Sequence, residues 1–185
     1  MTAEHTSTYT GKQRVLHWLV AILVLTLLPM GFLMVDSGES EFWSTVGDLL
    51  YATHKSLGFI VIWLVVWRIA LRMNRPAATY PSSMPLAMQI LIRITHRWLY
   101  ILLLATALLG WAGVTAYPAL TLTAGLSIPP MPFVPQDEEL SKQLFEIHGS
   151  LAIILSVLVA LHIAGALKHK FMDRDGVFER MTSGN

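Results

Sequence analysis

The 185-residue sequence contains no cysteine, which excludes several classes of protein at once. Without thiols the chain forms no disulfide, binds no iron–sulfur cluster and no thiolate-ligated zinc, and has no C-x-x-C-H motif for covalent attachment of a c-type haem. Any metal chemistry would therefore depend on the seven histidines and the carboxylates.

Charged residues are also scarce. They make up only 14% of the chain, whereas soluble domains have about 25%. Hydrophobic residues make up 54%, a balance too apolar for a water-soluble fold. The net charge of +1 gives no indication of a nucleic-acid partner. Internal repeats and low-complexity runs are absent as well, so we expect a single domain over residues 1–185.

Four long apolar stretches predict the architecture. A helix needs about 20 apolar residues to cross a hydrocarbon core about 30 Å thick. Residues 15–35 and 147–167 carry no charged side chain, and two further apolar stretches lie between them. We therefore expect an all-α, integral membrane four-helix bundle, with spans at about 13–36, 46–73, 84–117 and 141–171.

The placement of lysine and arginine predicts the orientation of the bundle. Lys55 and Lys142 fall at one end, and the end that carries both termini has the other eleven: Lys12, Arg14, Arg68, Arg72, Arg75, Arg93, Arg97, Lys168, Lys170, Arg174 and Arg180. We therefore expect both termini to be cytoplasmic. That end has eleven basic and four acidic residues, net +7, and the opposite end has two basic and eight acidic residues, net −6.

Five histidines lie inside or at the edges of the spans: His17, His54, His96, His148 and His162. Ionisable side chains at membrane depth are costly and are candidate functional residues. His148 and His162 are 14 residues apart on the fourth span, so they share a helix face and lie about 21 Å apart along its axis. By depth, His54 is expected to pair with His148, and His17 with His162.

Two stacked bis-histidine pairs favour two b-type haems, because two neutral imidazoles hold such a haem without a covalent bond. Two histidines alone fall short of a tetrahedral zinc site. Histidines hydrogen-bonded to neighbouring helices, or a proton relay without haem, are alternative interpretations. Three glycines lie beside the predicted ligands, where they admit a flat macrocycle or mark helix–helix contacts: Gly58, Gly149 and Gly165.

Several motifs together resemble the prokaryotic cytochrome b561 family. They are Gln13-Arg14-Val15-Leu16-His17-Trp18, His54 followed by Gly58, Arg68-x-x-x-Arg72, His96-x-x-x-Tyr100, His148-x13-His162, His169-x-x-x-Asp173 and Asp175-Gly176-Val177-x-x-Arg180-Met181. The resemblance covers essentially the whole chain. It implies a dihaem b-type cytochrome of the bacterial cytoplasmic (inner) membrane that passes electrons between a periplasmic donor and ubiquinone. One activity in the family is the oxidation of superoxide, which would make the chain a quinone-linked oxidoreductase.

Three further residues are candidates for the site. His96 is either an interfacial histidine facing lipid headgroups, or a residue that hydrogen-bonds quinone or an inner-haem propionate and relays a proton; ligation in place of His17 is a third interpretation. Arg68 is either the partner of an inner-haem propionate or an anchor on the basic side. Lys55 is either the partner of an outer-haem propionate or of an incoming anion, or a snorkelling lysine.

The sequence thus predicts a membrane protein that conducts single electrons through two b haems to quinone near His96. An alternative is a haem-bearing anchor subunit that passes electrons for a partner dehydrogenase or hydrogenase. A transporter-like bundle without haem is the second alternative, and it would purify as a colourless protein. A net charge of −6 at the outer end is unfavourable for an anionic donor such as superoxide, unless Lys55 or Lys142 offsets it locally.

Overall fold

The computed structural model describes residues 9–35, 41–74, 80 and 84–183 of the chain. Four long helices dominate them: α1 (Gly11–Val35), α2 (Glu41–Asn74), α3 (Leu86–Ala116) and α4 (Glu138–Lys168). Three short elements accompany them, namely η1 (Thr123–Gly125), η2 (His169–Asp173) and α5 (Glu179–Thr182). Arg75, one of the basic residues used to predict the orientation, lies outside the described residues.

Local sequence signals explain where two of the long helices begin. Thr10 and Gln13 form a capping box, in which the Gln13 side chain accepts from the Thr10 backbone N–H at 3.0 Å and the Thr10 hydroxyl accepts from the Gln13 N–H at 3.3 Å. Asp137 caps α4, because its carboxylate accepts a hydrogen bond from the Leu140 N–H at 2.8 Å. Helix α1 continues through Pro29, as membrane helices tolerate.

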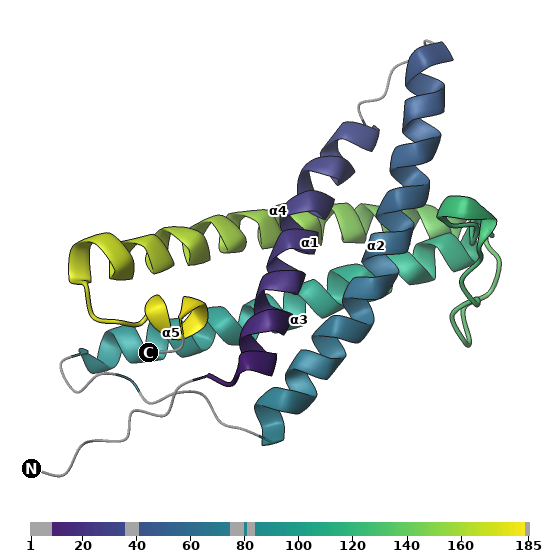
Figure 1. Cartoon of the computed structure of the whole chain (residues 1–185). Coiled ribbons are helices and arrows are strands. Elements are labelled where there is room, and N and C mark those ends of the chain that lie inside the picture. Colours follow the sequence, from purple (N-terminus) through teal and green to yellow (C-terminus); the bar gives the residue numbers. More distant parts are fainter. Residues whose placement is uncertain (1–8, 36–40, 75–79, 81–83, 184–185) are drawn as a thin grey trace, which may run out of the picture.

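The helices pack as two crossing pairs, visible in Figure 1, with α1 against α2 and α3 against α4. Contacts between α2 and α3 join the pairs. A small buried core of branched side chains lies between α1 and α2, and residues of α3 and α4 pack onto it. Its fully or nearly buried members are Val20, Val24, Leu27, Val61 and Val65.

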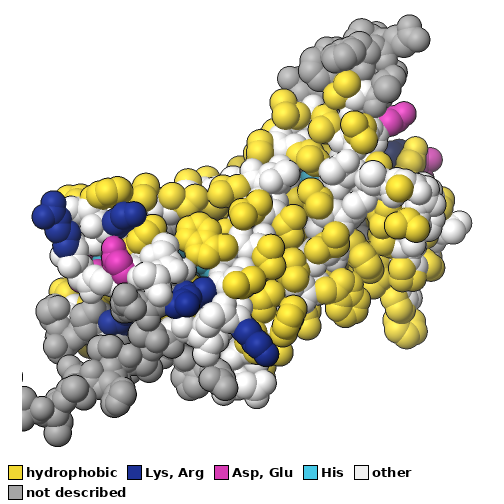
Figure 2. Space-filling model, viewed as in Figure 1, with side chains coloured by type: hydrophobic (Ala, Val, Ile, Leu, Met, Phe, Trp, Pro, Cys, Tyr) yellow, Lys and Arg dark blue, Asp and Glu magenta, His cyan; other side chains and the backbone are white. Residues whose placement is uncertain are grey.

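Most large apolar side chains face outward. Figure 2 shows hydrophobic side chains over most of the visible face, with charged side chains gathered toward the ends. In the described part of the chain, four segments are long and apolar enough to cross a membrane: Gly11–Met34, Val46–Asn74, Leu86–Ala116 and Glu138–Asp173. An apolar surface of this extent is stable only in lipid, so the predicted four-helix membrane bundle is confirmed. The cytoplasmic location of the termini stays a prediction.

The proline-rich segment between α3 and α4 lies across the ends of α2 and α3. The Lys55 ammonium donates to the Ala119 carbonyl at 2.9 Å, and the Trp111 indole N–H donates to the Pro129 carbonyl at 2.9 Å. Thr115 accepts from the backbone N–H of Met131 at 2.9 Å. We call this the loop end of the bundle, and the opposite end, with the start of α1 and the end of α4, the basic end.

Candidate haem-binding sites

The structure brings the predicted histidine pairs together. At the loop end, the rings of His54 on α2 and His148 on α4 have centroids 6.2 Å apart and planes at 77°. At the basic end, the rings of His17 on α1 and His162 on α4 have centroids 6.3 Å apart and planes also at 77°. The two pairs therefore repeat one geometry at two depths, and α4 contributes one histidine to each.

His96 on α3 also lies in the basic-end cluster, but in a different geometry. Its ring centroid is 5.1 Å from that of His162, with the planes at 82°. Its Nδ1–H donates to the Ile92 carbonyl at 2.7 Å, because a carbonyl oxygen can only accept. The neutral ring therefore presents Nε2 as a hydrogen-bond acceptor. Since the His17–His162 pair matches the other pair and His96–His162 does not, the geometry favours His17 over His96 as the partner of His162.

The Nδ1 atoms of the paired histidines differ in their surroundings. His148 Nδ1 donates to the Thr106 carbonyl of α3 at 2.8 Å, which fixes the ring and leaves Nε2 as its lone-pair nitrogen. The Nδ1 atoms of His17 and His54 are buried and have no hydrogen-bond partner among the described residues.

Two glycines that sequence reasoning missed lie directly against the loop-end pair. A Cβ added to Gly31 would lie 3.4 Å from His54 Cε1, and one added to Gly110 would lie 3.1 Å from both Cε1 and Nδ1 of His148. The bare backbone of α1 and α3 thus lets each imidazole approach closely. A usable signal was present: Gly31 follows His17, and Gly110 follows His96, by 14 residues.

The same spacing recurs on all four long helices. Arg68 follows His54, and His162 follows His148, also by 14 residues. Each helix thus contributes one residue at each of the two depths of the histidine pairs. We call these depths the loop-end level and the basic-end level. The loop-end level has two histidines and two glycines (Gly31, His54, Gly110 and His148), and the basic-end level has three histidines and an arginine (His17, Arg68, His96 and His162).

The glycines predicted to admit a macrocycle face open space. A Cβ added to Gly58, Gly149 or Gly165 would meet no atom within 4 Å. Gly113 is different, since a Cβ there would lie 2.6 Å from the Phe145 ring and so marks close contact between α3 and α4. The first three leave room beside the predicted ligands, and the last is a packing position.

Arg68 brings positive charge to the basic-end level. It lies close enough to His17, His96 and His162 for its charge to act on all three rings. Its guanidinium also lies 5.4 Å from the centroid of the Tyr100 ring. Within the described residues, neither Arg68 nor the nearby Arg72 forms an ion pair with a carboxylate.

Lys55 and Lys142, the two basic residues of the loop end, are both engaged. Lys55 binds the Ala119 carbonyl of the loop rather than a neighbour of His54. Lys142 forms an exposed ion pair with Glu138 at 3.0 Å. Neither contact offers an unpaired cation to an approaching anion.

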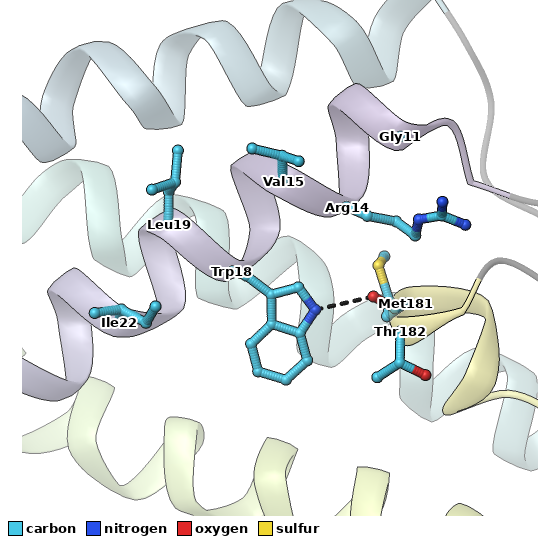
Figure 3. A pocket seen from close by; sticks show the side chains of 8 residues that line it. All are labelled: Gly11, Arg14, Val15, Trp18, Leu19, Ile22, Met181 and Thr182. Carbon is cyan, nitrogen blue, oxygen red and sulfur yellow. Dashed lines mark hydrogen bonds between the residues drawn. The ribbon is translucent and has the colours of Figure 1, made fainter.

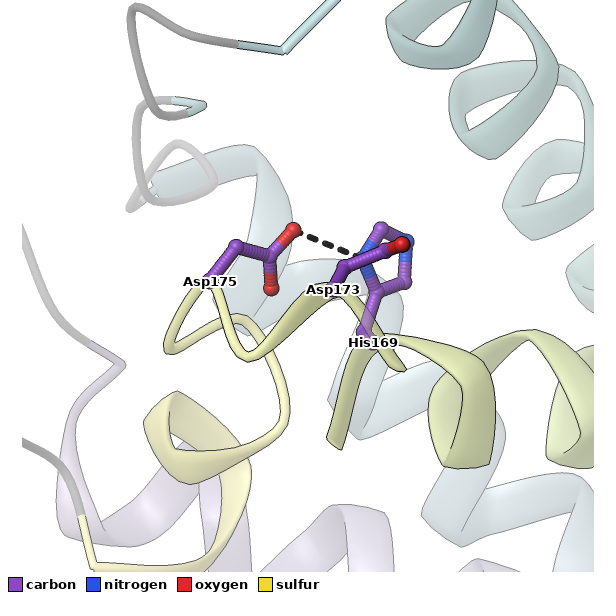
Figure 4. Close-up of side chains that lie close together, drawn as sticks. All are labelled: His169, Asp173 and Asp175. Atoms are coloured by element: carbon purple, nitrogen blue, oxygen red, sulfur yellow. Dashed lines mark hydrogen bonds and ion pairs between the residues drawn. The ribbon is translucent and has the colours of Figure 1, made fainter. Parts of the chain in front are cut away.

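A third cluster lies where α4 ends. Figure 4 shows His169 beside Asp173 and Asp175, with His169 Nδ1 2.7 Å from Asp175 Oδ2 and 3.4 Å from Asp173 Oδ2. Their three candidate ligand atoms lie within 4.8 Å of one another. The Lys168 ammonium already binds both oxygens of Asp173, at 2.7 and 2.5 Å. The cluster holds the turn after η2, since Asp175 also accepts from the Val177 N–H at 3.2 Å.

Comparison with known proteins decides the family. The model of the family described as prokaryotic cytochrome b561 matches residues 8–184. The chain belongs to the prokaryotic cytochrome b561 family. It is 30% identical over 166 residues to cytochrome b561 homolog 2 of Escherichia coli (strain K12), covering 89% of this chain and 86% of the relative. It is 29% identical over 179 residues to cytochrome b561 homolog 1 of the same organism, covering 94% and 96%.

Membership of the cytochrome b561 family defines the broad activity. The chain is a bacterial multi-pass membrane protein and a b-type cytochrome that binds haem and transfers electrons. Its donor set fits that cofactor. Two metal–imidazole bonds of about 2 Å on opposite sides of a metal, with ring centres about 1 Å beyond each nitrogen, give ring centres about 6 Å apart. Both histidine pairs show that separation, at 6.2 and 6.3 Å.

Proposed function

We propose that this cytochrome carries electrons between a donor at its loop end and ubiquinone at its basic end, in the bacterial inner membrane, with two non-covalent haems b as cofactors. Haem b held by two imidazoles supplies exchange of one electron at a time. His54 and His148 would hold one haem, and His17 and His162 the other. The observation that carries the proposal is the identical geometry of the two pairs at two depths.

The residues around the two histidine pairs differ in charge, which supports a different role for each pair. Gly31 and Gly110 let the loop-end imidazoles approach α1 and α3, which orients the two rings without adding charge. At the basic end, the guanidiniums of Arg68 and Arg72 have no carboxylate partner among the described residues. A cation within a membrane-spanning helix requires an anion nearby, and the propionates of a haem are carboxylates that would meet this requirement.

The hydrogen bond and the position of His96 support a role for this residue in proton transfer to quinone. Reduction of quinone to quinol consumes two electrons and two protons, so a quinone site needs a proton-carrying group. Because His96 Nδ1–H donates to the Ile92 carbonyl, its Nε2 can take a proton from water and donate it to a quinone oxygen. Its ring lies against His162, which places this proton carrier beside the basic-end pair.

The charge of the loop end bears on the choice of electron donor. The family resemblance suggests superoxide, each molecule of which gives up one electron and leaves as O₂. The loop end has a net charge of −6 by sequence, and its two basic residues are engaged in other contacts. Superoxide would therefore approach against electrostatic repulsion, and a neutral or cationic donor would approach without it.

Reconstituted vesicles test this function directly. We expect the purified chain, in vesicles containing ubiquinone and supplied with superoxide or another one-electron donor from outside, to convert quinone to quinol. His162→Ala and His148→Ala should each abolish the conversion, because each removes a residue from one pair. Quinol formation at the wild-type rate in both variants would refute the proposal.

A further inference from the structure

A groove of about 420 Å³ runs between the start of α1 and the C-terminal α5, and none of the four paired histidines lines it. Figure 3 shows its polar end, where Arg14 lies near Thr182, and its apolar wall along α1. The Trp18 ring lies between Ile22 and Met181. None of the roles proposed above uses this groove.

A specific contact forms the groove. The Trp18 indole N–H donates to the Met181 carbonyl at 2.9 Å, which holds α5 against α1 across 163 positions of sequence. The His169–Asp175 contact fixes the turn that leads to α5. The groove is therefore a built feature of the fold rather than a gap between separate segments.

The polar end of the groove favours an anion. Arg14 is only partly exposed, and among the described residues its guanidinium has no hydrogen-bond or ion-pair partner. A guanidinium presents five N–H donors that match the oxygens of a phosphate. Arg14 also lies at the end of the bundle that carries eleven of the 13 basic residues, which attracts anionic lipid headgroups.

The wall of the groove favours a hydrocarbon chain. Val15, Leu19 and Ile22 lie on one face of α1 and are 60%, 46% and 60% exposed. From Gly11 to Ile22 the helix rises about 16 Å. That length matches one leaflet, which is half of a hydrocarbon core about 30 Å thick.

We infer that this groove binds one anionic phospholipid, with its phosphate on Arg14 and an acyl chain along Val15, Leu19 and Ile22. The bound lipid occupies the space between α1 and α5 and so stabilises the C-terminal segment against the bundle. A quinone has an apolar tail of similar character, but its head is neutral and leaves the Arg14 charge without a counterion. The charge of Arg14 therefore favours the phospholipid.

Spin-labelled lipids test the inference in the haem-loaded full-length protein. The chain is reconstituted in phosphatidylcholine vesicles with a trace of labelled phosphatidylglycerol or labelled phosphatidylcholine, and electron paramagnetic resonance measures the immobilised fraction of each. We expect the wild type to retain phosphatidylglycerol preferentially. Arg14→Gln should abolish that preference, whereas Arg97→Gln should keep it, since Arg97 is an exposed arginine of the same end outside the groove.

A second variant and two competitors complete the test. Leu19→Trp, which fills the wall and leaves Arg14 in place, should also lower retention of phosphatidylglycerol, with the haem spectrum of every variant unchanged. An equal fall in Arg14→Gln and Arg97→Gln, or no fall in Arg14→Gln, would overturn the inference. Full release of the label by inorganic phosphate would reduce the groove to a simple anion site, and full release by decylubiquinone would assign it to quinone; either result contradicts the proposal.

Discussion

At the scale of single residues, four histidines define the two candidate haem sites. His17, His54, His148 and His162 are ionisable residues in apolar spans, and helix geometry alone relates a 14-residue spacing to a shared face. Sequence reasoning therefore paired them correctly in space, at 6.3 and 6.2 Å between ring centroids. That they bind haem iron stays a prediction.

The partners of these histidines were less predictable. Depth along a helix placed His96 near the basic end but could not show that its ring contacts His162 or that its Nδ1 donates to Ile92. Contacts of this kind depend on helix rotation, which is set by packing against neighbouring helices. Lys55 illustrates the same limit, since its ammonium binds the carbonyl of a loop 64 residues away.

Arg68 should tune the electron affinity of the basic-end site. Arg68→Gln removes a positive charge whose field reaches both His17 and His162, so the reduced and more negative form of a haem there loses stabilisation. We expect the midpoint potential of one haem to fall in a spectroelectrochemical titration, with haem content unchanged. The other haem is the internal control, and equal shifts of both potentials would contradict a local role for Arg68.

His96 should matter for quinone rather than for haem binding. His96→Gln keeps a polar side chain but removes an imidazole that can take up and release a proton, so protonation of quinone should slow about 10²-fold or more, the usual contribution of general acid catalysis. The measurement is the rate of quinol formation at constant haem content, followed against pH. Loss of one haem in this variant would instead support ligation by His96.

At the scale of helices, the repeated 14-residue spacing organises the site. Composition and hydropathy predicted four helices, and the structure has them, because long apolar runs in lipid must form helices to satisfy their backbone groups. The glycines at the same spacing, Gly31 and Gly110, were missed because glycine in a membrane helix ordinarily reports helix–helix contact. Their place in the site can be recognised only from their 14-residue spacing to the histidines at the other end of the same helices.

The close approach of α3 to His148 gives an element-level prediction. Gly110→Ala places a methyl group 3.1 Å from two atoms of the His148 ring, so the ring or the helix must shift. We expect the haem at the loop end to be lost or to change its spectrum, while the haem at the basic end is unaffected. Gly11→Ala is the matched control, because its Cβ would meet no atom within 4 Å. Identical spectra for the two variants would show that this contact has no role.

At the scale of the whole molecule, the order of the spans predicts a strong difference in charge between the two ends, +7 against −6, although the net charge is only +1. How the α1–α2 pair crosses the α3–α4 pair was not predictable, because packing between helices depends on surfaces that hydropathy does not resolve. Contacts between distant segments at the basic end, such as the hydrogen bond from Trp18 to the Met181 carbonyl, depend on this packing and were not predictable either.

The negative charge of the loop end predicts how the rate of haem reduction by the electron donor depends on salt. If superoxide is the donor, added salt screens its repulsion from the loop end, so the rate of haem reduction should rise with ionic strength. Lys142→Gln, which removes one of only two cations there, should slow the reaction at low salt and have little effect at high salt. A rate of haem reduction by superoxide that falls with salt in the wild type would contradict net repulsion at the loop end.

We propose that the two histidine pairs hold two haems independently, so the number of haems per polypeptide is the decisive measurement. Reduced-minus-oxidised spectra with haem quantified per polypeptide should give two non-covalent haems b for the wild type. His148→Ala and His162→Ala should each leave one haem, and the remaining haem should differ between them. A wild-type chain without haem, or variants that both keep two haems, would contradict the account.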